Sequence, residues 1–473
     1  DADVGLAQKW YEKALEAFLV REESVKKKEK PYLQYRIGKM YASGLGAEQN
    51  YEKAAHWFSQ AAAMDHKYAQ YSLAGLYRRG RGVEQNDIRA FSLYMSSAEQ
   101  GNPYASLELA KMYRDGLGTE PDLQQAEWRF QNAYSGFVVL EEKSHDDKLQ
   151  YRIGQMLHTG TGTSKDDEGA ARYWEKSAKL GNINAQYALG TLWLETGSGD
   201  SGQAVEWLTK AANAEHSAAQ YVLGKLYQDG VYFNKDMDQA MKWFRSAAEL
   251  GNEYAAYRMG CLLLLGEEIP KDVEAAVKWL SLSAEKGNPY AQYRLGMLYL
   301  KGEEYSPQVE VAMKWLQQAA EQKNEWAFYQ LGKLYLSGEH VTKNVETAVH
   351  YLGLCAEKGN QYAQYVLGKL YLCGRDVSRD REKAVEYLTA SAEQGNLYAS
   401  FLLEHLDAYQ DPSLFLAATR LLHHLEKLFC EEVQRPMEMK RYQIDRKRRR
   451  KLLEKKQAQG HHREDQEPAQ GIY

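Results

Sequence analysis

The sequence predicts an all-α fold: an α/α superhelical solenoid of about ten 36-residue helix-turn-helix repeats, followed by a C-terminal capping helix and a basic tail. Two observations predict this fold. A four-residue motif such as YRLG returns along the chain at a nearly constant period, and each interval between two copies holds two amphipathic helical patterns. A helix pair of this kind cannot bury its apolar face alone, whereas a stack of such pairs shares one continuous core.

The motif is spaced by 36 residues in most intervals, with one interval of 44 and one of 34. The longer interval holds an insertion near Tyr134–Lys148, and the shorter interval has a reduced loop at Ser198–Gly202. The eleven copies begin at Tyr35, Tyr71, Leu107, Tyr151, Tyr187, Tyr221, Tyr257, Tyr293, Tyr329, Tyr365 and Phe401. We call the helix that carries the motif the first helix of its repeat and the following one the second helix.

Residues 272–302 show how the two helices are delimited. Asp272 is expected to cap one helix, and Gly287 to end it in a left-handed conformation. Asn288 begins the next helix as a cap and is followed by a first-turn proline. Gly296 lacks a side chain, which we expect to let a neighbouring helix approach closely. On the second helices we expect seven tryptophans to be buried: Trp57, Trp128, Trp174, Trp207, Trp243, Trp279 and Trp315.

The chain divides into four predicted segments. Residues 1–34 form a truncated leading repeat and connector, in which Ala7–Phe18 has the pattern of a second helix, so we expect a piece of a longer chain. Residues 35–400 form the solenoid. Residues 401–435 contain a cap with an amphipathic helix around Pro412–Val433, and residues 436–473 form a basic, flexible tail.

These motifs resemble the Sel1-like repeat family, a relative of the tetratricopeptide repeats. The resemblance lies in AQYRLGMLYLKG (Ala291–Gly302) and VEAAVKWLSLSAEKGN (Val273–Asn288), and it extends over nearly all of residues 35–400. It implies a right-handed superhelix whose inner surface is lined by the first helices. It also implies a scaffold that binds a peptide or protein.

A helical wheel of residues 291–302 places a tyrosine, a lysine position and a leucine position opposite the buried face. Together these positions predict a groove for an acidic, partly apolar partner. The alternative is that the tyrosines stack on their neighbours and the lysines form a solvated stripe. The candidate groove residues are Tyr221, Lys225, Tyr257, Leu264, Tyr293, Met297, Leu300, Lys301, Tyr329, Lys333, Leu336, Tyr365, Lys369 and Leu372.

Composition and motifs favour a non-catalytic protein. We find no catalytic triad, metal-ligand set or phosphate loop, and we expect no cofactor and no small-molecule substrate. A catalytic domain upstream of this chain remains open. The longest apolar run, MGCLLLLG, is too short to span a membrane. The four cysteines show no pairing pattern, which favours a reducing, cytoplasmic location.

The segment Lys440–Lys456 carries ten cationic and two acidic residues. Such a segment could bind the phosphates of a nucleic acid. A nuclear-import signal or a contact with an anionic membrane would use the same charges. The overlapping segment Ile444–Glu467 is similar to the C-terminal end of bacterial MobP/MobL-type relaxases, some of which carry Sel1-like repeats. This similarity implies a role in conjugative DNA mobilisation, and the rival interpretation is an adaptor in signalling or protein quality control. The expected DNA contacts are Lys440, Arg441, Arg446, Lys447, Arg448, Arg449, Arg450 and Lys451.

Overall fold

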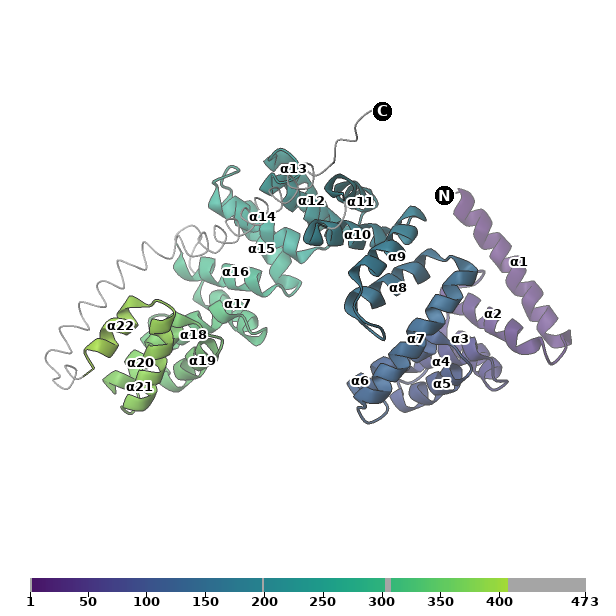
Figure 1. Cartoon of the computed structure of the whole chain (residues 1–473), viewed down its shortest axis with the longest axis horizontal. Coiled ribbons are helices and arrows are strands. Elements are labelled where there is room, and N and C mark those ends of the chain that lie inside the picture. Colours follow the sequence, from purple (N-terminus) through teal and green to yellow (C-terminus); the bar gives the residue numbers. More distant parts are fainter. Residues whose placement is uncertain (1, 198–199, 303–307, 407–473) are drawn as a thin grey trace, which may run out of the picture. The chain divides into compact units, whose positions relative to one another are not determined.

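The computed structural model describes residues 2–197, 200–302 and 308–406, and these ranges fold into 22 helices without a strand (Figure 1). The predicted all-α repeat fold is therefore confirmed. The predicted capping helix around Pro412–Val433 and the basic tail lie outside the described residues. The first helices are α2 (Lys30–Ser43), α4 (Lys67–Arg79), α6 (Pro103–Asp115), α8 (Asp147–Thr159), α10 (Ile183–Thr196), α12 (Ser217–Asp229), α14 (Glu253–Leu265), α16 (Pro289–Lys301), α18 (Glu325–Ser337), α20 (Gln361–Cys373) and α22 (Leu397–Glu404).

The second helices alternate with them along the chain. They are α1 (Ala2–Ser24), α3 (Tyr51–Ala62), α5 (Asp87–Glu99), α7 (Leu123–Ser144), α9 (Asp167–Lys179), α11 (Ser201–Asn213), α13 (Met237–Glu249), α15 (Val273–Glu285), α17 (Val309–Glu321), α19 (Val345–Glu357) and α21 (Arg381–Glu393). The insertion near Tyr134–Lys148 lengthens α7, which has 22 residues where α5 and α9 have 13.

The chain forms two compact units, which we call unit 1 (up to Ser283) and unit 2 (from Ala284). In each unit, a first helix packs most closely against the second helix that follows it in the same repeat. The second helix then packs against the first helix of the next repeat. Each unit is thus a stack of helix pairs.

The predicted helix ends are present. Asp272 Oδ1 accepts a hydrogen bond from the Ala275 backbone N–H at 2.9 Å, and Asn288 Oδ1 accepts one from the Ala291 N–H at 3.0 Å. Gly287 has a φ of 96°, in the left-handed region that favours glycine. These caps satisfy backbone groups that a helix end leaves without a partner.

A glycine–leucine contact joins the two helices of a repeat. A Cβ added to Gly296 would lie 2.7 Å from Leu316 Cγ and 2.9 Å from its Cδ2, which is closer than van der Waals contact. Gly332 meets Leu352 in the same way, at 2.6 and 2.9 Å. The close approach predicted for Gly296 is therefore confirmed, and it lets a fully buried leucine fill the space that the glycine leaves.

Serine side chains also join the helices. The Oγ atom of Ser97 donates a hydrogen bond to the Lys67 carbonyl oxygen at 2.6 Å. Ser391 donates to the Gln361 carbonyl oxygen at 2.7 Å, again across 30 residues. Both serines have no exposed surface, so these bonds fix how the second helix is placed along the first.

The prediction of seven buried tryptophans is wrong. Trp174 is buried, with 4% of its surface exposed, but Trp128 is 49% exposed. The other five, Trp57, Trp207, Trp243, Trp279 and Trp315, are half-buried. Except in the repeats of Trp128 and Trp174, the fully buried side chain is the residue after the tryptophan, such as Phe244.

These half-buried tryptophans lie at the edge of the apolar face. Trp243 packs against the cluster around Leu208, which belongs to the preceding repeat. Trp279 packs in the same way against the cluster around Phe244. The indoles therefore fill the seam between one repeat and the previous one.

Among the residues that the structure describes, no helix combines the length and the apolar character needed to cross a membrane.

Candidate partner-binding site

The candidate groove residues of unit 2 lie on three first helices, α16, α18 and α20. Tyr329 is half-buried, and its ring centroid lies 6.4 Å from that of Tyr362 at the start of the next first helix. Tyr365 is only 6% exposed and lies 6.1 Å from Tyr398 in the same way. The two ring pairs are tilted, with interplanar angles of 54° and 46°, so each motif tyrosine contacts a ring of the next repeat without stacking on it, and Tyr329 is only half-buried.

Lysines cover these rings one helical turn further on. The Lys333 Nζ lies 5.7 Å from the centroid of Tyr329, and the Lys369 Nζ lies 5.8 Å from that of Tyr365. This is the distance at which an ammonium group is attracted by an aromatic face. Both lysines are half-buried, so the tyrosine holds each cation in place while part of it stays in contact with solvent.

The remaining unit 2 candidates differ in accessibility. Tyr293, Met297 and Leu336 are half-buried and pack against one core cluster, which contains Leu316 and Leu352. Lys301 is exposed. Leu300 and Leu372 are buried, with 9% and 3% of their surface exposed, and a partner cannot reach them. We therefore define the unit 2 face by its accessible members, Tyr293, Met297, Lys301, Tyr329, Lys333, Leu336 and Lys369.

The unit 1 candidates repeat the arrangement on α12 and α14. The centroid of Tyr221 lies 6.4 Å from that of Tyr254, and the Lys225 Nζ lies 5.8 Å from the Tyr221 centroid. Tyr257 and Leu264 are half-buried. The same tyrosine–lysine combination thus occurs in each of the two units.

The sequence analysis missed a second row of tyrosines, three residues before the repeated motif. Tyr32, Tyr254 and Tyr290 are 57%, 52% and 52% exposed, more than the motif tyrosines that follow them. Residues three apart on a helix share a face, so each exposed ring lies beside a motif tyrosine. The period of the sequence carried this signal, since tyrosine recurs at this position as well.

Four motif tyrosines of unit 1 have phenol groups whose pKa is shifted by burial. Burial raises the pKa of Tyr35, Tyr71, Tyr151 and Tyr187 above the ordinary value for a phenol. Among the described residues, no three His, Cys, Asp or Glu side chains come together in a way that could hold a metal ion.

The family model described as Sel1 repeat matches eleven segments, which together cover most of the chain. The chain belongs to the Sel1 repeat family. The matched segments are residues 1–17, 31–66, 67–102, 103–128, 148–182, 183–216, 217–252, 253–288, 289–324, 327–360 and 361–396. The resemblance found in the sequence is thereby confirmed, and the family match is interrupted between residues 128 and 148.

Two solved structures are similar to this Sel1 repeat chain. The first is c5321, a protective antigen present in uropathogenic Escherichia coli strains, with 27% identity, coverage of 87% of each chain and a TM-score of 0.51. The second is a Sel1 repeat protein from Oxalobacter formigenes, with 29% identity, coverage of 67% of this chain and 89% of that one, and a TM-score of 0.46.

A curated relative is chitin synthase regulatory factor 1 of Schizosaccharomyces pombe. It is 31% identical over 106 residues, which are 21% of this chain and 23% of the relative. The Sel1 repeat chain thus spans less than a quarter of the curated relative that it matches. Sel1 repeats imply protein partners for the chain, and the comparisons name none.

Proposed function

We propose that the chain is a non-catalytic scaffold that binds an acidic, partly apolar peptide or protein segment on the first helices. The unit 2 face is the proposed site. The observation that carries the proposal is the lysine held over a half-buried tyrosine at Tyr329 and Lys333. The next repeat places Lys369 over Tyr365 at the equivalent position.

The chemistry of the face selects the partner. Fixed ammonium groups attract carboxylates and repel basic segments, which favours an acidic partner. Tyr293, Tyr329 and Met297 offer apolar surface beside these charges, and tyrosine loses little rotamer entropy when it makes a contact. A segment with acidic residues on one side and apolar ones on the other would use both features.

Charge reversal tests this site. A labelled peptide array is screened with the full chain, and the best peptide is then titrated by fluorescence anisotropy. Lys333→Glu with Lys369→Glu should weaken binding about tenfold or more, because charges that attracted carboxylates now repel them. The control, Lys286→Glu with Lys314→Glu, makes the same charge change at two exposed residues of unit 2, one in the turn directly after α15 and one on α17. Equal affinity loss in both double variants would contradict the proposal.

The cellular setting is a further proposal. In the conjugative interpretation, a bacterial, cytoplasmic scaffold recruits its partner through residues 35–400, and the tail 440–456 contacts DNA. The name of the S. pombe relative, a regulatory factor, instead supports the adaptor interpretation. DNA binding that falls steeply with salt and disappears when residues 440–456 are deleted would support the conjugative setting. Binding that survives the deletion would exclude this tail as the DNA contact.

A further inference from the structure

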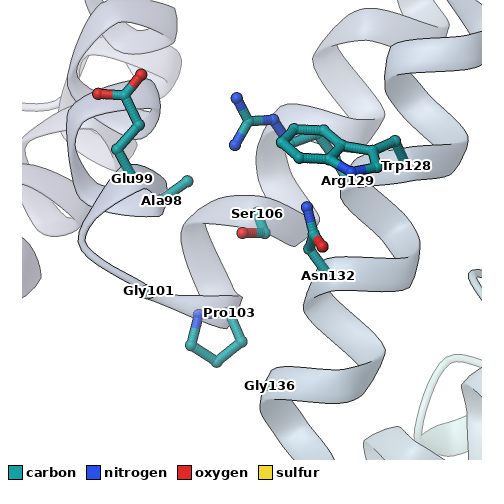
Figure 2. Close-up of a pocket in the computed structure, with 9 residues that line it drawn as sticks. All are labelled: Ala98, Glu99, Gly101, Pro103, Ser106, Trp128, Arg129, Asn132 and Gly136. Atoms are coloured by element: carbon teal, nitrogen blue, oxygen red, sulfur yellow. The ribbon is translucent and has the colours of Figure 1, made fainter.

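A pocket of about 430 Å³ lies in unit 1, between the end of α5, the start of α6 and the middle of α7 (Figure 2). Glu99 comes from α5, Pro103 and Ser106 come from α6, and Trp128 and Arg129 come from α7. Figure 2 shows the Arg129 guanidinium directed toward the end of α5 that bears Glu99, with the Trp128 indole beside it. This volume falls in the range of small-ligand sites.

Arg129 is a buried cation without an acidic partner. Only 8% of its surface is exposed, and its Nε atom is buried and has no hydrogen-bond partner. Its Nη2 donates to Met95 Sδ at 2.8 Å, and a thioether is a weak acceptor. No carboxylate of the described chain forms an ion pair with it. Burial lowers the pKa of Arg129, and Tyr113 and Glu99 offset this only partly.

The sequence order at this point is the reverse of that in other repeats. Where other second helices have a polar residue followed by the seam tryptophan, as in Lys242–Trp243, α7 has Trp128 followed by Arg129. The same polar–tryptophan order occurs at His56–Trp57, Glu206–Trp207, Lys278–Trp279 and Lys314–Trp315. The exchange turns the indole outward, where Trp128 is 49% exposed, and places the guanidinium in the seam.

The pocket follows from this exchange. An indole at the position of Arg129 would fill the seam with the preceding repeat, as Trp243 does. The guanidinium group instead reaches Met95 of α5 and leaves the space open. The family match also stops at residue 128 and resumes at 148, so the pocket-lining part of α7 after Trp128 departs from the Sel1 pattern.

Burying an unpaired charge is strongly unfavourable, so a group that neutralises Arg129 would be held firmly. A carboxylate fits because its two oxygens match the guanidinium fork. The amide of Asn132 makes no hydrogen bond within the described chain and is a further donor at the pocket wall. The Arg129 guanidinium lies over the half-exposed Trp128 ring, with its carbon 4.4 Å from the ring centroid, so the indole both contacts the cation and gives the pocket an apolar wall.

We infer that this pocket binds a carboxylate group presented by a peptide, with Arg129 as the anion-binding residue and Trp128 as the apolar wall. The pocket contains one cation, and Glu99 lies at its edge. A singly charged carboxylate is matched by this charge, whereas a doubly charged phosphate would be left partly uncompensated. Glu99 repels any anion, and its repulsion is larger for the doubly charged phosphate than for a carboxylate. The site lies on α5, α6 and α7 of unit 1 and shares no residue with the unit 2 face.

The test uses the full chain, with two small anions and a set of three labelled peptides as probes. Sodium acetate and inorganic phosphate are titrated while the Nε–H resonance of Arg129 is followed by NMR, assigned by its loss in Arg129→Leu. Labelled peptides are then compared in sets of three by anisotropy: one with a free C-terminal carboxylate, an acid-free amide, and an amide with an internal glutamate. The two acidic members distinguish a terminal carboxylate from a side-chain one.

Arg129→Leu should remain folded, because Leu93 occupies the same position in the preceding repeat. Its melting temperature should equal or exceed that of the parent chain, since a buried unpaired charge is removed. Its affinity for the carboxylate-bearing peptides should fall about tenfold or more. Trp128→Ser, which copies Ser92, should weaken binding less, and Arg172→Leu, at an exposed residue of α9, should not change it.

The inference is supported if acetate shifts the Arg129 resonance and the acidic peptides lose affinity in Arg129→Leu. It is overturned if acetate leaves the resonance unchanged, if phosphate binds more tightly than acetate, or if the acid-free amide binds as well as the acids. Because Lys333 and Lys369 are unchanged in these variants, a failure here leaves the proposal for the unit 2 face standing. Likewise, Arg129 is unchanged in the charge-reversal variants, so a failure of that experiment leaves the proposal for this pocket standing.

Discussion

Gly332 and Gly353 lie on the two helices of one repeat, and replacing either by alanine adds the same methyl group in a different environment. A Cβ at Gly332 on α18 would lie 2.6 Å from Leu352 Cγ and 2.9 Å from its Cδ2. A Cβ at Gly353 on α19 would meet nothing within 4 Å. Both glycines are inside helices, so the intrinsic gain in helix propensity from alanine is the same at the two sites.

Gly353→Ala should raise the free energy of unfolding by about 1 kcal/mol, the usual difference between alanine and glycine in a helix. Gly332→Ala receives the same gain but forces Leu352, which has no exposed surface, out of its position. Overpacking of this kind costs roughly 1–3 kcal/mol, so we expect Gly332→Ala to be destabilising by about 1 kcal/mol after the two effects are combined.

Urea unfolding followed by far-UV circular dichroism measures the two changes, and amide hydrogen exchange in α18 and α19 locates them. The local measurement is needed because a repeat protein can unfold in parts rather than in one step. The Gly332→Ala, Leu352→Ala cycle isolates the contact, since the methyl group should be tolerated once the leucine is shortened. If Gly332→Ala stabilises the chain as much as Gly353→Ala, the glycine–leucine contact does not limit the helix distance.

Two further predictions concern the core and the helix caps. Phe244→Ala should cost about 3–5 kcal/mol because that side chain is fully buried, and Trp243→Ala should cost less because it is half-buried. Thermal unfolding of both variants checks this ranking, and a larger loss from Trp243→Ala would contradict it. His66 and His216 accept hydrogen bonds through Nδ1 from the N–H groups of Ala69 and Ala219, both at 3.2 Å, and burial lowers the pKa of each histidine. The folded state therefore binds fewer protons than the unfolded one, and stability should fall as pH drops below the unfolded value of about 6.5. Replacing both histidines by asparagine, which caps α6 and α10, should remove this part of the pH dependence. An unchanged pH profile of the melting temperature would refute the role of these caps.

The period of the motif predicted the helix pairs, and local residue types predicted their ends. Asp272, Asn288 and Gly296 act as expected because capping and close approach depend on a few neighbouring residues. The tryptophans were misplaced because a wheel of one helix shows the centre of the apolar face but not its edges. Trp243 lies at an edge that only the preceding repeat covers.

The prediction of the groove residues was partly wrong for the same reason, because a helical wheel does not include the neighbouring repeats. A wheel divides a helix into a buried and an exposed side, whereas a first helix in a stack also has neighbours before and after it. The wheel placed Leu372 opposite the buried face, yet it is 3% exposed and belongs to a core cluster with residues of its own second helix, α21, and of the next first helix, α22. Tyr290 was not predicted as a groove residue because it lies three residues before the motif used for alignment, although it is 52% exposed.

In a repeat protein each structural position occurs once in every repeat. A residue that differs from its equivalents in the other repeats therefore indicates a role beyond packing. A tryptophan in the seam is sufficient for packing in the repeats around Trp207, Trp243 and Trp279. The stack therefore does not need Arg129 in that place, and packing alone offers no reason for a buried cation that has no carboxylate partner among the described residues. The tyrosine–lysine pairs recur and can serve a long partner along several repeats, whereas Arg129 occurs once and suits a single anchoring group. Recurring residues thus point to an extended interface, and the exception points to a discrete pocket.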